Sequence, residues 1–402
     1  MDKTITKLTF LGKFYYIPNS VQRLLSAQVK PENVDKHIAP IPPTAEEVYR
    51  DWYDFTTKNV LFQSIGEKGL ITLNRPHASN ALLYPVCKQI MDKLKEWETQ
   101  KKLVVIEGTG DKAFCSGGDL TLLRYIFFRD GDLRKRQFFG TIYPLFNKIH
   151  SYKVPYICIM DNITMGNGAG LSIHGKYRIV TERSIFSMPE VSLGFIPDGG
   201  CTYAFPRLQG ELGMFLALTA HKLTGKDIVL SGIGTHYVPS EKLPGLKHAL
   251  LLSDSTDVEE IIKQYAEQVS MGDFTLTPYM ETINQCFSAP TVAEIVHRLD
   301  ADRSKWAHKT LKTLSYMSPL SLKVAHRALR KGKELSFDEC SKMEFRLAWT
   351  LLNINTDFYK GISAMMNRSD KPQWDPPTLH DVKMESVIRC FDLLEPDKEL
   401  KL

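Results

Sequence analysis

The chain has 402 residues, of which 43% are hydrophobic, 10% aromatic and 24% charged, and its formal net charge is +5. These proportions are close to those of an average folded globular chain and exclude disordered, collagen-like and coiled-coil proteins. No run of about 18 uncharged apolar residues occurs, so the sequence predicts no membrane span. The seven cysteines are scattered without a CxxC pair, which favours a reducing compartment and predicts no metal site.

Most of the net charge lies in residues 1–31, which carry five basic side chains and one acidic side chain, a net +4. A basic head with hydroxyl side chains and almost no acid resembles a mitochondrial transit sequence. A solvated tail without a function fits the same composition. Prolines at 31–43 predict an extended connector, and residues 44–53 predict a short helix with Thr44 as its N-cap. Residues 1–55 are therefore expected to form an N-terminal extension.

Residues 56–255 alternate predicted strands and helices. Apolar runs at 60–65 and 69–73 flank a turn with glycine at both ends, which predicts a hairpin. A helix with one apolar stripe is expected at 84–98, and further strands at 103–106 and 155–160. Because strand, strand and helix recur, we expect an α/β fold with a parallel-rich sheet.

Residues 256–402 are expected to form a C-terminal helical region. Apolar side chains recur at helical spacing in four segments, 256–269, 291–299, 305–315 and 320–331.

Two glycine-containing turns carry the first chemical suggestion. Residues 113–119 include Ser116, Gly117, Gly118 and Asp119, and residues 165–171 include Gly166, Asn167 and Gly168. Small residues let backbone N–H groups converge on one point, and two such groups form an anion or oxyanion site. Glycines between a strand and a helix also serve close packing, so each turn by itself permits both interpretations.

Residues 188–200 bring two carboxylates, Glu190 and Asp198, into a largely apolar segment with prolines and glycines. Apolar neighbours would raise the pKa of both groups and suit them to proton transfer or nucleophilic attack near neutral pH. The alternative is that both acids are exposed turn residues that cap helices.

Together these segments resemble the enoyl-CoA hydratase/isomerase (crotonase) superfamily. The resemblance begins at Ile71-Thr-Leu-Asn-Arg-Pro76, passes through all three segments and extends beyond Thr235-His-Tyr-Val238. Within the superfamily, residues 318–323, Met343-Glu344 and Pro372-Gln-Trp374 resemble the subgroup of 3-hydroxyisobutyryl-CoA hydrolases. The resemblance covers residues 56–397. It implies a spiral of ββα units with a C-terminal helical region over an acyl-CoA pocket.

The resemblance also implies an activity, hydrolysis of a short-chain 3-hydroxyacyl-CoA thioester in the mitochondrial matrix, as in valine catabolism. The thioester oxygen would lie between the backbone N–H groups of Ser116 and Asn167. The acid at Glu190 would attack the thioester or activate water, and Asp198 would handle the far end of the substrate or the proton. A hydratase of the superfamily usually has glycine in place of Asp198, which favours hydrolysis here. The implied substrate contacts are Gly117, Gly118, Asp119, Gly166 and Gly168, and the CoA thioester is the substrate, with no cofactor implied.

Two positions depart from the superfamily pattern. Asn167 occupies the middle of a turn that is normally Gly-Gly-Gly, so its side chain must point away from the acyl group or intrude on it. Ile142 stands where the subgroup usually has a glutamate, so one polar substrate contact is expected to be missing.

The partners that the resemblance implies are of two kinds. Relatives of this fold commonly form trimers, so a homo-oligomer is one expectation. The hydrolase fold also occurs as a component of the mitochondrial small ribosomal subunit in some lineages. A basic head with aromatic residues at 14–16 would then contact ribosomal proteins and rRNA by phosphate contacts and stacking. This alternative assigns reduced or no enzymatic activity.

Overall fold

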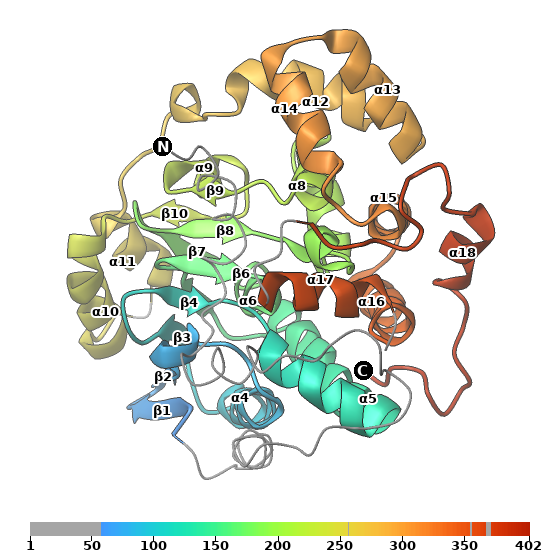
Figure 1. Ribbon diagram of the computed structural model, residues 1–402. Helices are drawn as coiled ribbons and strands as arrows, with labels where there is room; N and C mark the ends of the chain where they lie inside the picture. Colours follow the sequence, from blue (N-terminus) through green and yellow to red (C-terminus); the bar gives the residue numbers. More distant parts are fainter. Residues whose placement is uncertain (1–57, 256, 354–355, 367–370) are drawn as a thin grey trace, which may run out of the picture.

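The computed structural model describes residues 58–255, 257–353, 356–366 and 371–402 (Figure 1). The predicted basic head, the proline-rich connector and the short helix at 44–53 lie outside the described residues. The division of the chain at residues 55 and 255 stays a prediction.

The larger of two β-sheets has the strand order β1-β2-β3-β5-β7-β10. The pair β1–β2 is antiparallel, and the following pairs are parallel. The bounds are β1 Val60–Ile65, β2 Lys68–Leu73, β3 Leu103–Gly108, β5 Tyr156–Ile159, β7 Tyr177–Val180 and β10 His236–Tyr237. The predicted hairpin and the strands expected at 103–106 and 155–160 are thus confirmed.

Strand β3 shows why these apolar runs become strands of a buried sheet. Its side chains alternate between two apolar clusters, with Val104 and Ile106 on one face and Leu103 and Val105 on the other. All four are fully buried. A strand covered on both faces needs a continuous apolar sequence rather than an alternating one.

The smaller sheet has the order β4-β6-β8-β9, in which β4, β6 and β8 run parallel. The bounds are β4 Ala113–Cys115, β6 Ile163–Met165, β8 Ile185–Ser187 and β9 Leu223–Thr224. Each of the first three follows a strand of the larger sheet and precedes a helix, so the ββα unit recurs as expected. Because β4, β6 and β8 are parallel neighbours, their carboxyl ends lie at one edge of the sheet.

The helices of this half of the chain cover the sheets (Figure 1). Their bounds are α4 Tyr84–Trp97, α5 Leu120–His150, α6 Asn167–Ser172, α7 Cys201–Ala204, α8 Leu212–Thr219 and α9 Lys226–Leu230. Helix α4 buries the stripe that the sequence predicts, with Val86, Ile90, Leu94 and Trp97 facing the core. Helix α5 begins where the Asp119 carboxylate accepts a hydrogen bond from the N–H of Leu122 at 3.1 Å.

From α10 onward the chain is mainly helical, as expected. The bounds are α10 Leu243–Leu252, α11 Val258–Tyr265, α12 Met280–Phe287, α13 Val292–Asp302, α14 Lys305–Leu314, α15 Pro319–Gly332, α16 Phe337–Leu351, α17 Asp357–Met366 and α18 Met384–Arg389. Helix α11 ends at Tyr265 rather than near residue 269. The reason is that the Glu267 N–H donates to the Tyr237 carbonyl at 2.9 Å and pairs with β10.

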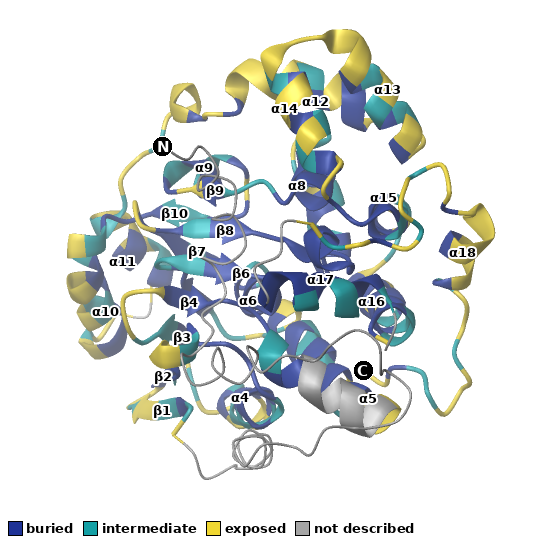
Figure 2. Ribbon diagram, in the orientation of Figure 1, coloured by how far each residue is buried: buried dark blue, intermediate teal, exposed yellow. Residues whose placement is uncertain are grey.

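The C-terminal helices differ in how deeply they pack. Helix α16 lies along α5, and α17 lies beside the segment that follows β8 (Figure 1). Strands β2, β3 and β5 and helix α8 are largely buried, whereas β1, α12–α14 and α18 present exposed faces (Figure 2). Across the described segments, no helix combines the length and the apolar character needed to cross a membrane.

Candidate active site

The three segments singled out in the sequence meet at the shared edge of the smaller sheet. The turn at 116–119 follows β4, the turn at Gly166 and Asn167 follows β6, and Glu190 begins the 3-10 helix η2 (Glu190–Leu193) after β8. A Cβ on Gly168 would lie 2.3 Å from the carbonyl oxygen of Cys115, and a Cβ on Gly117 would lie 3.3 Å from the backbone nitrogen of Asn167. Glycine is therefore required here because two backbones touch.

The backbone N–H of Ser116 is already engaged. It donates a hydrogen bond to the carbonyl oxygen of Ser79 at 3.1 Å. Ser79 adopts a left-handed conformation, φ 52°, in a turn that the side chain of Asn80 ties to the carbonyl of Ala113 at 2.9 Å. The expectation that Ser116 supplies an oxyanion donor is therefore not met by this geometry, because a loop distant in sequence takes its N–H.

At the same edge, the N–H groups of Gly118 and Asn167 have no acceptor among the described residues. The Leu82 N–H donates to the carbonyl of Gly117 at 2.7 Å, and the Leu82 carbonyl accepts from the N–H of Asp119 at 3.2 Å. Gly118 lies between Gly117 and Asp119 and is paired with Leu82 in a parallel bridge, so its own N–H faces away from Leu82. The N–H of Asn167 belongs to the first residue of α6, where a helix has no internal acceptor. Within the described chain, neither Gly118 N–H nor Asn167 N–H donates to a protein acceptor.

The Glu190 carboxylate lies beside these two turns. The side chain is 6% exposed, and a Cβ on Gly166 would lie 3.1 Å from its Oε1. Its Oε2 is buried and has no hydrogen-bond partner among the described residues. Burial, and secondarily the charge of Asp198, raises the pKa of Glu190 well above its ordinary value. The alternative that Glu190 is an exposed turn residue is wrong.

Asp198 is also buried, with 3% of its surface exposed, so the exposed alternative is wrong for this acid too. Its Oδ2 accepts a hydrogen bond at 2.8 Å from the hydroxyl of Tyr143 on α5. Burial raises the pKa of Asp198 to about 7, and the Tyr143 hydrogen bond limits that rise. The protonated form of Asp198 is therefore far more accessible near neutral pH than it is for an exposed aspartate.

The turn after Asp198 is held by a residue from the C-terminal region. The Glu344 carboxylate of α16 accepts hydrogen bonds from the N–H of Gly200 at 2.8 Å and from the N–H and hydroxyl of Thr202 at 3.1 and 2.6 Å. Glu344 is fully buried, and burial followed by the charge of Asp198 raises its pKa to about 8. The opposite side of the turn is tied by His174, whose Nε2 lies 2.7 Å from the carbonyl oxygen of Gly199.

The roles of Tyr143 and Glu344 were not predicted from the sequence. Glu344 appears in the sequence only as part of a resemblance, and Tyr143 gives no signal beyond being the residue after Ile142. Ile142 itself is fully buried and does not line the cavity. The polar contact from this stretch of α5 thus comes from Tyr143, and it goes to Asp198.

The predicted substrate contacts divide into two groups. Gly117, Gly118 and Gly166 line the cavity, as do Ser116, Asn167, Glu190 and Asp198. Asp119 and Gly168 do not. Asp119 caps α5 and forms an ion pair with Arg75 at 3.2 Å, so its contacts support the turn rather than the cavity.

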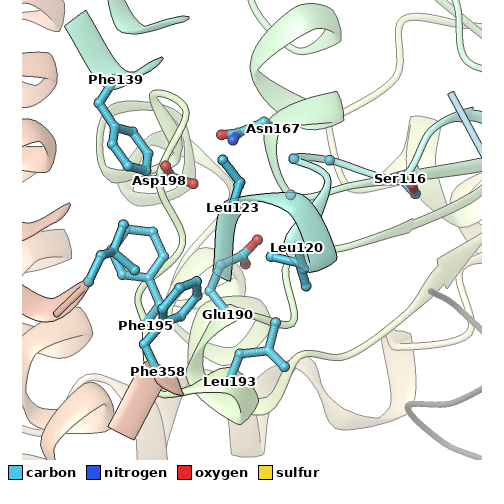
Figure 3. Close-up of a pocket in the computed structure, with 14 residues that line it drawn as sticks. Ser116, Leu120, Leu123, Phe139, Asn167, Glu190, Leu193, Phe195, Asp198 and Phe358 are labelled. Atoms are coloured by element: carbon cyan, nitrogen blue, oxygen red, sulfur yellow. The ribbon is translucent and has the colours of Figure 1, made fainter. Parts of the chain in front are cut away.

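The walls of the cavity are apolar and come from both halves of the chain (Figure 3). Helix α5 contributes Leu123 and Phe139, and the C-terminal region contributes Leu352 and Phe358. The remaining apolar lining residues are Leu120, Leu193 and Phe195. The helical region therefore covers the cavity, as expected, and it excludes water from the two carboxyl groups.

This arrangement fits chemistry at a carbonyl group. Two backbone N–H groups without protein acceptors lie beside a desolvated carboxylate, and a second carboxyl with a pKa near neutrality lies in the same cavity. Such donors stabilise an oxyanion, and such carboxyl groups act as nucleophiles or transfer protons.

Comparisons with known proteins agree with this geometry. Residues 68–391 match the family model described as enoyl-CoA hydratase/isomerase. The chain is 42% identical to "3-hydroxyisobutyryl-CoA hydrolase, mitochondrial" of Danio rerio over 85% of this chain and 91% of that protein. It is 39% identical to the human protein of the same name over 84% of this chain and 89% of the other.

Solved structures with the same fold are less similar in sequence. A carnitinyl-CoA dehydratase from Mycobacterium thermoresistibile superposes with a TM-score of 0.80 at 32% identity and covers 86% of this chain and 99% of its own. An enoyl-CoA hydratase from Rhodobacter sphaeroides superposes with a TM-score of 0.76 at 30% identity and covers 86% of this chain and 100% of its own.

Proposed function

The chain belongs to the enoyl-CoA hydratase/isomerase family, and on that premise we propose that it hydrolyses the thioester of 3-hydroxyisobutyryl-CoA in mitochondria. The relatives that share about 40% identity over most of the chain are named as mitochondrial hydrolases of this substrate. The proteins named as a dehydratase and a hydratase are more distant, at 32% and 30% identity. The observation that carries the proposal is the buried pair of carboxyl groups beside two backbone N–H groups that have no acceptor in the described part of the chain.

The thioester carbonyl oxygen binds between the N–H groups of Gly118 and Asn167. Both lie at the edge of the smaller sheet, and neither has another acceptor in the described part of the chain. As the carbonyl becomes tetrahedral, these donors stabilise the oxyanion, a contribution of about 3–4 kcal/mol for each donor. Gly118 replaces Ser116 in this assignment because the Ser116 N–H is donated to Ser79.

Glu190 is the reacting carboxylate. Its Oε2 has no partner among the described residues and burial raises its pKa, so the ionised form is disfavoured, poorly solvated and correspondingly reactive toward an electrophilic carbon. Either its oxygen attacks the thioester carbon or it takes a proton from a water molecule that attacks. In both routes the carbon–sulfur bond breaks, water is consumed, and the free acid and CoA are released.

Asp198 carries the proton that the departing sulfur needs. A pKa of about 7 matches the working pH of a proton donor, because the group is protonated often enough to donate and acidic enough to do so quickly. Tyr143 orients the carboxyl by its 2.8 Å hydrogen bond. The CoA thioester is the substrate in this scheme, and the acting groups all belong to the chain.

Release of free CoA from 3-hydroxyisobutyryl-CoA tests the proposal. Glu190→Gln should lower kcat by roughly a thousandfold or more, whereas Glu241→Gln makes the same chemical change on the surface and should leave turnover unaltered. Direct attack forms a mixed anhydride between Glu190 and the acyl group as the thiolate leaves, and water then hydrolyses it. Label in the Glu190 carboxyl after a single turnover in ¹⁸O-water establishes this route, because it requires water to add to the Glu190 carbonyl of the anhydride. Addition of water to an enoyl-CoA without release of CoA would instead make the chain a hydratase.

The other expected partners receive less support. The relatives and structures reported above are named as hydrolases, a hydratase and a dehydratase, none as a ribosomal protein. The basic head that motivated the ribosomal alternative lies outside the described residues, so that alternative stays a prediction. A homo-oligomer stays a prediction, and analytical ultracentrifugation would test it by measuring the oligomeric state.

A further inference from the structure

Two buried polar atoms of the cavity wall have no hydrogen-bond partner among the described residues, Oε2 of Glu190 and Oδ1 of Asn167. The first belongs to the reacting carboxylate. The second has no part in the proposed reaction, because catalysis uses only the backbone N–H of Asn167. A buried amide oxygen without a partner is costly, since it has lost its water and gained nothing in exchange. The side chain of Asn167 therefore needs an explanation of its own.

The position of this side chain indicates that it would lie next to the acyl group of a bound substrate. Asn167 is the first residue of α6 and lines the cavity, and its side-chain Oδ1 is buried there without a partner among the described residues. The residue is 8% exposed, and its Nδ2 lies 3.5 Å from where a Cβ on Gly118 would be. The amide thus lies close to Gly118, whose N–H is one of the two proposed oxyanion donors, and it projects toward the side of the cavity that holds the Asp198 carboxylate (Figure 3). An acyl chain whose thioester oxygen binds those donors must pass close to it.

The chemistry of the walls restricts what the amide can bind. The neighbouring side chains Leu123 and Phe139 are apolar, so a charged group would lose its hydration without compensation. An uncharged hydroxyl is the complementary group, because a carboxamide both accepts and donates a hydrogen bond. Asp198 is less suited to the same task, since Tyr143 already occupies its Oδ2.

We propose that the side-chain amide of Asn167 binds the hydroxyl group of the acyl chain and selects hydroxylated acyl-CoA substrates over unsubstituted ones. This inference rests on the proposed function, because it requires an acyl-CoA in the cavity. A role in filling space alone would be served by an apolar side chain of the same size, which would leave no amide unsatisfied. A site that hydrogen-bonds a substrate hydroxyl discriminates strongly against the analogue without it, because its own polar group then stays unpaired.

The test compares kcat/KM for 3-hydroxyisobutyryl-CoA and for isobutyryl-CoA, which differ only in the hydroxyl. The wild-type chain should prefer the hydroxylated substrate by roughly tenfold or more. Asn167→Leu keeps the size and removes the amide, and Asn167→Gly removes the side chain; both should reduce the preference by about tenfold. Leu123→Ala is the matched control, because it enlarges the same cavity without changing its hydrogen bonding and should leave the ratio unchanged. Circular dichroism verifies that each variant is folded.

The outcomes separate this inference from the function on which it rests. An unchanged ratio in the folded Asn167 variants, or a wild type without preference, overturns the inference and leaves the hydrolase intact. A wild type that releases CoA from neither substrate overturns the proposed function. In that case the inference is tested by binding: calorimetry measures the Kd of each thioester for the wild-type chain and for Asn167→Gly. A hydroxyl preference that the variant lacks supports the inference, and equal preference in both proteins overturns it.

Discussion

Replacement of Tyr143 by Phe isolates a single hydrogen bond to Asp198. Phenylalanine fills nearly the same volume, so the packing of α5 is kept while the 2.8 Å hydrogen bond is lost. That bond favours the ionised form of Asp198, whose pKa is about 7. A hydrogen bond to a charged group contributes about 1.5–3 kcal/mol, and one pKa unit corresponds to about 1.4 kcal/mol. The pKa of Asp198 should therefore rise by about one to two units.

The assay is the pH profile of kcat/KM for CoA release, which reports ionisations of the free enzyme. Because Asp198 donates its proton in the proposed mechanism, its ionisation sets the alkaline limb, and Tyr143→Phe should move that limb upward by about one to two pH units. Tyr152→Phe is the control, since it removes a tyrosine hydroxyl that donates at 2.8 Å to the Leu94 carbonyl on α4. An alkaline limb that stays in place or moves to lower pH in Tyr143→Phe would refute the reasoning.

Two further predictions concern stability. Glu344 has a pKa of about 8 in the folded chain, above the ordinary value of 4.5, so between those values the folded state keeps a proton that the unfolded state releases. The free energy of unfolding therefore decreases as the pH rises, by about 1.4 kcal/mol per pH unit for this group. Urea titrations from pH 6 to 8 should show a smaller decrease in Glu344→Gln than in wild type. Equal decreases in the two proteins would contradict this prediction. Gly194→Ala should destabilise the chain by several kcal/mol, because φ is +79° and the new Cβ would lie 2.2 Å from the carbonyl carbon of Asp357. Gly66→Ala is the control, because φ is +54° but no atom lies within 4 Å of the new Cβ. It should cost about 1 kcal/mol in the same titration. Equal losses in the two glycine variants would show that the contact with α17 does not matter.

The sequence predicted the elements whose signal is local. The apolar runs of β1, β2, β3 and β5 and the stripe of α4 can be recognised without a partner, because each is long enough to show its periodicity. Strands β4, β6 and β8 have only three residues each, too few to show any periodicity. These are the strands that bring the three functional segments to one edge.

The residues of the candidate site were also only partly predictable from the sequence. Glu190 and Asp198 could be singled out because two acids among apolar residues, prolines and glycines are unusual. Only their burial in the folded chain shows that they are a desolvated pair rather than exposed turn residues. Tyr143 and Glu344 could not be found, since they reach Asp198 and its turn from 55 and 142–144 residues away along the chain. The engagement of the Ser116 N–H by Ser79 is a contact between loops that local sequence does not encode.

Residue type and spacing along the chain suffice to predict the fold class, the order of the three functional segments and the identity of both carboxyl groups. Only the folded chain shows which N–H groups have no acceptor among the described residues, which side chains support Asp198 and where the amide of Asn167 lies. Each of these depends on segments that meet only after folding, when burial removes water and one loop takes or leaves the hydrogen-bonding groups of another.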